Sequence, residues 1–122
     1  MRPDELRDQC LSFAGSTETF PFGHETSVFK VAGRIFALSR LEQCPLQVSV
    51  KCEPLLAEQL RHAHAAIRPG HHLNKRHWNT VIIDGSIGDR VIRDMIEDSY
   101  DLVVSALPRS RRRALGWEAE ER

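Results

Sequence analysis

The chain has 122 residues, of which 41% are hydrophobic and 28% are charged, and its 17 Lys and Arg residues balance 17 Asp and Glu residues. These values are typical of one folded domain and exclude wholesale disorder. A formal net charge of zero excludes a protein drawn onto nucleic acid by its total charge, but it allows a local basic face. The sequence contains neither an apolar run of the ~20 residues that span a bilayer nor a signal-peptide core, so we expect a soluble, cytoplasmic protein without a membrane partner.

The first half of the chain predicts one helix followed by strands. Apolar residues at helical spacing behind an early proline predict a helix over residues 3–13. Residues 28–38 are rich in β-branched and aromatic side chains around an Ala-Gly break, which predicts a β-hairpin. Residues 46–52 alternate between apolar and polar, which is typical of a strand with one buried face.

The second half of the chain predicts two helices around another strand. Pro54 begins an apolar helical stripe, which we expect to continue until the break near residues 68–70. Residues 80–83 predict a strand, and helical spacing from Asp89 to a stop at Pro108 predicts a long final helix. This order is typical of the α+β class, so we predict a twisted antiparallel sheet with helices packed on one face.

We expect a single domain over residues 1–108 and a charged tail over residues 109–122. The tail begins with four arginines within five positions and ends with three glutamates and an arginine. Such a segment could be a solvated tail, a helical extension whose charges pair with one another, or a mobile arm that contacts phosphates.

Nothing in the sequence predicts catalysis or a cofactor. The cysteines, Cys10, Cys44 and Cys52, are odd in number and widely spaced, which indicates reduced thiols with a structural role. The sequence contains no phosphate-binding loop, nucleophile motif or paired-carboxylate spacing, so we expect no catalytic residues.

The most unusual segment lies between Gln59 and Ile83, which contains no carboxylate. It holds four cationic residues and five of the six histidines: Arg61, Arg68, Lys75, Arg76, His62, His64, His71, His72 and His77. This window, folded partly as a loop before a strand, is either a site for phosphate or another anion, or an ordinary solvated loop. The histidine pairs lack the i, i+4 spacing and the acidic companions of a zinc site, so we expect no metal.

Short motifs spread in order over roughly residues 3–108 resemble the MmcQ/YjbR family of small bacterial proteins. The runs at residues 74–78 and 99–103 are the most specific. In chain order the motifs are Thr17-Glu18-Thr19, Phe20-Pro21-Phe22-Gly23, Val28-Phe29-Lys30-Val31, Gly33-Arg34-Ile35-Phe36-Ala37, Val50-Lys51-Cys52-Glu53-Pro54, Pro69-Gly70-His71-His72-Leu73-Asn74-Lys75-Arg76-His77-Trp78 and Ser99-Tyr100-Asp101-Leu102-Val103.

The resemblance implies a CyaY-like α+β fold and a non-enzymatic DNA-binding protein, because similar proteins are described as gripping duplex DNA with two β wings. The family offers no settled catalytic residues. A neutral chain must concentrate its cations on one face in order to bind DNA. We therefore predict that the binding residues are those of the basic window and the cations of the neighbouring strands: Lys75, Arg76, His77, Asn74, His72, Lys51, Lys30 and Arg34.

The alternative, from another functional class, is a module that binds a small anionic ligand or a protein partner at the same residues. In either case we expect a monomer or a weak dimer and no cofactor. Trp78, directly before the predicted strand, is expected to anchor that strand in the core.

Overall fold

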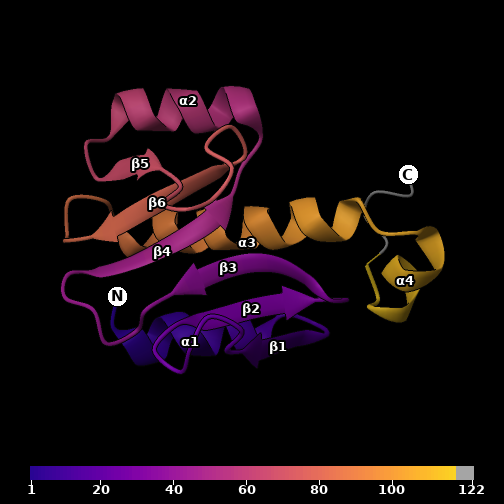
Figure 1. Cartoon of the computed structure of the whole chain (residues 1–122). Coiled ribbons are helices and arrows are strands. Elements are labelled where there is room, and N and C mark those ends of the chain that lie inside the picture. Colours follow the sequence, from indigo (N-terminus) through magenta and orange to yellow (C-terminus); the bar gives the residue numbers. More distant parts are fainter. Residues whose placement is uncertain (118–122) are drawn as a thin grey trace.

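An antiparallel sheet forms the centre of the computed structural model, which describes residues 1–117 (Figure 1). Within those residues the sheet has six strands in the spatial order β1-β2-β3-β4-β6-β5, and all neighbouring strands are antiparallel. The strands are β1 (Ser16–Thr19), β2 (Ser27–Val31), β3 (Arg34–Ser39), β4 (Leu46–Lys51), β5 (Ile67–Pro69) and β6 (Trp78–Ile83). The predicted α+β class with an antiparallel sheet is confirmed.

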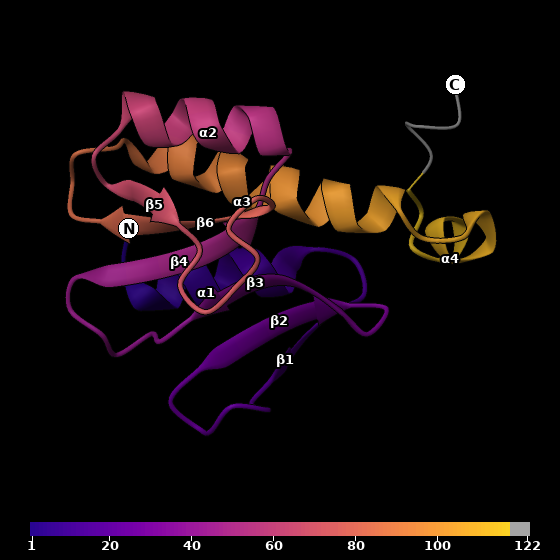
Figure 2. The same cartoon turned by 45° about the horizontal axis from the view of Figure 1, so that its top comes forward.

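Helices cover one face of this sheet and, in the described part of the chain, leave the other face free of helices (Figures 1 and 2). The helices are α1 (Pro3–Ser12), α2 (Pro54–Ala63), α3 (Asp89–Ser105) and α4 (Arg109–Ala114). α3 packs over β3 and β4, α1 contacts β1, and α2 contacts β5 and β6, whereas α4 lies beyond the end of α3. Among residues 1–117, no helix is both long enough and apolar enough to cross a membrane.

The core lies between the sheet and the helices, as the alternation in residues 46–52 predicts. In β4, Leu46, Val48 and Val50 are at most 7% exposed, whereas the residues between them are half-buried. Val48 pairs directly with Val81 of β6. α3 closes the core with a stripe of buried apolar residues at helical spacing. The predicted strand and its buried face are confirmed.

The Ser-Tyr pair of α3 joins the helix layer to the sheet. Tyr100 stacks on Phe13 with 4.7 Å between ring centroids and meets the ring of Phe36 edge-on at 5.4 Å. The Tyr100 hydroxyl donates a 2.6 Å hydrogen bond to the main-chain oxygen of Ala14. The Ser99 hydroxyl donates to the main-chain oxygen of Phe36, also at 2.6 Å. These contacts give this sequence motif a structural role, since both buried hydroxyls have partners.

The structure differs from the sequence prediction at the edges of the sheet. The sequence does not predict β1 or β5, because edge strands of four and three residues are too short to show a periodic pattern. α2 ends at Ala63 rather than near residues 68–70, because His64 adopts an extended backbone and Ile67 pairs with Val81 of β6. This pairing buries Ile67 in the core, and a continued helix would lose that burial.

Residues 109–117 continue the structure past the predicted domain. The basic run forms α4, in which no residue is buried, and Leu115 after it packs against Gly15. Gly15 has a φ of +71°, and a Cβ at this position would collide with Leu115. The last residues of the predicted tail, 118–122, lie outside the described residues, so the division at residue 108 stays a prediction.

Candidate functional site

The helix-free face of the sheet is built from the strand residues that alternate with the core residues. In β4 these include Ser49 and Lys51, and the strand register places Thr80 and Trp78 of β6 directly beside them. The hydroxyl oxygens of Ser49 and Thr80 lie 2.8 Å apart and share a hydrogen bond. The face is therefore polar at its centre, with a cation and an aromatic ring next to each other at one end.

Two loops extend from opposite ends of the sheet toward this face (Figure 2). The 20–26 loop connects β1 to β2, and the 70–77 loop connects β5 to β6. The 70–77 loop turns back over the sheet because the main-chain N–H of His71 donates to the hydroxyl oxygen of Thr80 at 3.2 Å. The helix-free face thus lies at the bottom of the space between the two loops.

Most of the predicted binding residues meet at one end of the sheet. Because neighbouring strands are antiparallel, β2 and β4 end where β3 and β6 begin. Lys30 and Lys51 lie at the ends of β2 and β4, and Arg34 begins β3. The main-chain oxygen of His77 accepts a 2.7 Å hydrogen bond from Cys52, which holds the end of the 70–77 loop beside β4. We call this group of side chains the basic end: Lys30, Arg34, Lys51, Lys75, Arg76 and His77.

The cations of the basic end form no ion pair with any residue that the structure describes. The ion pairs within residues 1–117 use other cations, such as Arg40 with Glu25 at 2.7 Å and Arg7 with Glu18 at 2.8 Å. Acidic residues concentrate in the helix layer instead, where α3 alone carries five carboxylates against two arginines. The neutral chain is therefore divided into an acidic helix layer and a basic end of the sheet.

Asn74, one of the predicted binding residues, shapes the turn that presents its neighbours. Its side-chain oxygen accepts a 2.9 Å hydrogen bond from the main-chain N–H of Arg76. Its main-chain oxygen accepts a 3.1 Å hydrogen bond from the N–H of His77. Asn74 is thus a turn former whose carboxamide oxygen is already engaged, whereas the Lys75 and Arg76 side chains next to it are exposed.

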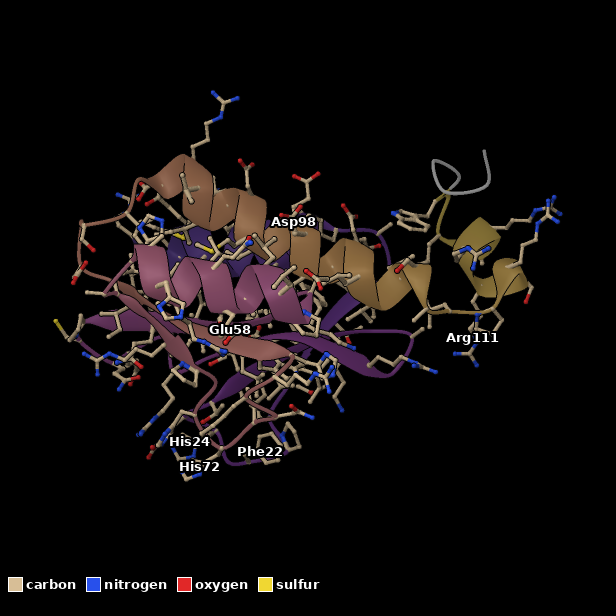
Figure 3. The ribbon with its side chains drawn as sticks, turned by 90° about the horizontal axis from the view of Figure 1, so that it is seen from above. Phe22, His24, Glu58, His72, Asp98 and Arg111 are labelled. Carbon is tan, nitrogen blue, oxygen red and sulfur yellow. The ribbon has the colours of Figure 1, made fainter. Side chains whose placement is uncertain are left out.

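A cavity of about 740 Å³ lies between the two loops on the helix-free face. Of the predicted binding residues, only His72 lines it, beside His71 at 3.9 Å between ring centroids. Figure 3 shows Phe22, His24 and His72 gathered on the side of the sheet opposite α2 and α3. Phe22 and His24 are not among the binding residues predicted from the sequence, although Phe22 belongs to the family motif at residues 20–23. The other lining residues are Gly23, Glu25, Thr26, Leu38, Ser39, Arg40, Gln43, Gln47, Ser49, Leu73 and Thr80.

The described residues offer neither a metal centre nor an activated thiol. Within residues 1–117, no three His, Cys, Asp or Glu side chains are grouped so that they could hold a metal ion. Burial, with a smaller contribution from Glu18, raises the pKa of the Cys10 thiol to about 12. Burial also raises the pKa of Cys52, as do the nearby carboxylates of Glu53 and Asp98. Thiols with raised pKa values are poor nucleophiles at neutral pH.

The fold and the site define a small α+β protein in which one sheet face is free of helices and ends in a cluster of cations. The chain belongs to the YjbR family, whose model matches residues 11–102. The predicted family membership is therefore confirmed.

Relatives of this chain occur in several bacteria. An uncharacterized protein YjbR of Escherichia coli is 36% identical over 115 residues, which cover 94% of this chain and 98% of that protein. An uncharacterized Escherichia coli protein, YbdF, is 39% identical over 89 residues, which cover 72% of each chain. The crystal structure of a Deinococcus radiodurans protein with a DUF419 domain has a TM-score of 0.89 and 41% identity, over 94% of this chain and 88% of that one. A Pseudomonas syringae crystal structure has a TM-score of 0.72 and 25% identity, over 84% of this chain and 98% of that one.

Proposed function

We propose that the protein binds double-stranded DNA in the cytoplasm through the basic end of its helix-free sheet face, without carrying out chemistry on it. The observation that supports this proposal is that cations from three strands and one loop, none of them in an ion pair with a residue of 1–117, meet at one end of the sheet in a chain whose net charge is zero. Cations that lack a carboxylate partner are available to neutralise phosphates, and the release of condensed counterions then drives binding.

The spacing of the basic end suits a row of phosphates. β2, β3, β4 and β6 are consecutive in the sheet, so the cations at the ends of the first three strands and in the loop before β6 are spread over roughly 14 Å. Contacts of this kind position a protein on the duplex without reading its sequence. The binding that we propose is therefore weakly sequence-specific.

The 20–26 loop offers a second contact, at the end of the sheet opposite the basic end. In the 20–26 loop, Phe20 and Phe22 are 48% and 67% exposed, whereas aromatic side chains are usually more deeply buried. Exposed aromatic rings, like cations, are common in proteins that bind nucleic acids. We infer that the two loops flank the bound duplex.

The second candidate function is the binding of a small anionic ligand, and the observation that favours it is the cavity between the loops. Its volume of about 740 Å³ lies in the range of ligand sites. His24, His71 and His72 line this cavity and provide ring N–H donors to an anion.

The experiment that tests the proposal is a fluorescence-anisotropy titration of labelled duplex DNA at several salt concentrations. We expect the Lys75→Ala/Arg76→Ala variant to weaken binding to all duplexes alike and to lower the slope of log K against log salt by about 0.9 for each lost phosphate contact. The matched control is Arg111→Ala/Arg113→Ala, which removes the same charge from exposed positions on α4 (Figure 3).

Two outcomes contradict the proposal. A loss that is larger in the α4 variant would move the DNA contact to the C-terminal segment. An absence of affinity at low salt, where electrostatic binding is strongest, would exclude DNA binding by the basic end. If inorganic phosphate or a nucleotide then shifts the NMR resonances of His24 and His72, the second candidate function replaces the first.

A further inference from the structure

A second hollow lies on the opposite side of the molecule, between α2 and α3. Its volume is about 360 Å³, and residues of β4 and β6 form its floor. Leu56 and Leu60 of α2 line one wall, and Met95 and Leu102 of α3 line the other. Trp117, which follows α4, also lines it. We call this hollow the α2–α3 groove.

The apolar side of α2 is only partly covered along this groove, because Leu60 packs against the core but Leu56 stays exposed. In α2 only Ala57 is buried, although Leu56 and Leu60 lie one turn apart as the stripe of a packed helix would. Leu56 is 41% exposed and Leu55 beside it is 63% exposed. Apolar surface therefore extends from the groove onto the outside of α2, and exposed patches of this kind mark interaction sites.

The α3 side of the groove is acidic. Asp94, Asp98 and Asp101 recur at i, i+4 and i+7, so they lie on one side of α3 over about 10 Å. Asp98 and Asp101 line the groove together with Glu53, the N-cap of α2. The lining also includes Lys51, but its position in β4 directs its side chain to the helix-free face.

The negative charge of Asp98 is not balanced by a nearby cation of the described residues. Asp98 has no hydrogen-bond or ion-pair partner among residues 1–117. Partial burial raises the pKa of its carboxyl group, and the carboxylates of Asp101 and Asp94 raise it further. Asp101 accepts one hydrogen bond, from the indole N–H of Trp117 at 3.4 Å. A cation placed beside these carboxylates would find two acceptors without an ion-pair partner among residues 1–117.

We propose that the α2–α3 groove docks a basic amphipathic helix of a partner protein. The apolar stripe of that helix packs against Leu56, Leu60 and Leu102, and its flanking Lys and Arg residues pair with Asp98 and Asp101. Two features favour a helix over a small ligand: the apolar surface continues outside the hollow, and the acidic side chains follow a helical repeat. The residues after Trp117 are rich in glutamate, so their charge does not suit the groove.

The test uses the full chain labelled with ¹⁵N and a synthetic amphipathic helix with a leucine stripe at i, i+3, i+4 and i+7 between two rows of lysines. We expect saturable amide shifts at residues that line the groove, and no shifts in the 70–77 loop. The same peptide with glutamate in place of lysine is expected not to bind. This proposal concerns the face opposite the DNA site, so the failure of either proposal leaves the other standing.

Variants of the groove sharpen the test. Asp98→Asn/Asp101→Asn should weaken binding of the lysine peptide at least about tenfold, whereas Asp4→Asn/Asp8→Asn on α1 removes the same charge far from the groove and should have little effect. Leu56→Gln changes a side chain that is already 41% exposed, so the fold should tolerate it while binding falls.

Three results would overturn the proposal. The first is equal binding of the glutamate peptide, and the second is an equal loss in the α1 variant, because either would show a contact that is not specific to the groove. The third is a set of shifts at the groove that depends on protein concentration in the absence of peptide. That result would make the groove an interface between two copies of this chain.

Discussion

The guanidinium group of Arg61 on α2 donates a 2.7 Å hydrogen bond to the main-chain oxygen of Lys75. A second hydrogen bond, of 3.2 Å, connects Arg61 to the side-chain oxygen of Asn79 in β6. Arg61 thus ties α2 to the 70–77 loop and to β6 through hydrogen bonds within the protein. The charge of Lys75 itself stays on the outside, because the contact with Arg61 uses only its backbone. Of these two cations of the same sequence window, Arg61 therefore stabilises the loop, whereas Lys75 presents its charge to solvent.

Arg61→Met should loosen the 70–77 loop. The variant keeps the aliphatic part of the side chain but removes both hydrogen bonds, so we expect a loss of about 1–3 kcal/mol in the free energy of unfolding. Hydrogen exchange should become faster at the amides of this loop. Arg68→Met is the control, because the Arg68 side chain has no hydrogen bond or ion pair within the described residues. Similar exchange rates in both variants would show that Arg61 does not hold the loop.

Val48→Asp should abolish stable folding. Val48 is 1% exposed and pairs with Val81 beneath the helices, so the variant buries a carboxylate without a partner. We expect a loss of more than about 4 kcal/mol, measured by thermal unfolding with circular dichroism. Ser49→Asp on the other face of the same strand should keep the fold. Cooperative unfolding of Val48→Asp near the wild-type temperature would contradict the assigned core.

Tyr100→Phe should lower the free energy of unfolding without changing the affinity for DNA. The variant keeps the stacking on Phe13 but leaves the main-chain oxygen of Ala14 without its 2.6 Å hydrogen bond. We expect a loss of about 1 kcal/mol in a urea titration. A variant that unfolds like the wild type but no longer binds DNA would show a functional role for the hydroxyl.

Gly70→Ala should displace the 70–77 loop from β6. A Cβ at this position would lie 2.7 Å from the Cβ of Trp78 and 3.1 Å from its main-chain oxygen, so the loop or the strand must shift. We expect a loss of about 1–3 kcal/mol and weaker DNA binding. Gly88→Ala is a matched control, because a Cβ there would meet no atom within 4 Å and the φ of Gly88 is an ordinary −63°. Equal stability of the two variants would argue against the close packing of Gly70.

Ionisation of the Cys10 thiol should lower the free energy of unfolding between pH 9 and pH 12. Burial raises the pKa of this thiol from an ordinary value of 9.0 to about 12, so the unfolded chain loses its thiol proton at lower pH than the folded protein. The stabilisation is complete below pH 9 and is lost as the pH rises through the folded pKa. Denaturant titrations of Cys10→Ala should show a weaker pH dependence in this range than those of Cys44→Ala, whose cysteine is exposed. Identical pH profiles would contradict the burial of Cys10.

The alternation of residues 46–52 and the helical stripe of α3 are readable from the sequence because each pattern is local. A strand with one buried face must alternate between apolar and polar residues, and a packed helix must repeat its apolar residues about every 3.6 positions. Neither pattern depends on which element the strand or helix packs against. For the same reason the sequence shows that the basic window between Gln59 and Ile83 contains no carboxylate.

The sequence by itself thus determined the class of fold, the main strands and helices, and the identity of most cations in the site. The tertiary structure alone decided that Lys30 and Lys51 lie at the same end of the sheet as the 70–77 loop, that Arg61 is used internally, and that His24 shares a cavity with His72. These relationships depend on which strands pair and in what register. Strand pairing joins residues far apart in the chain, and a local pattern of burial does not specify the partner.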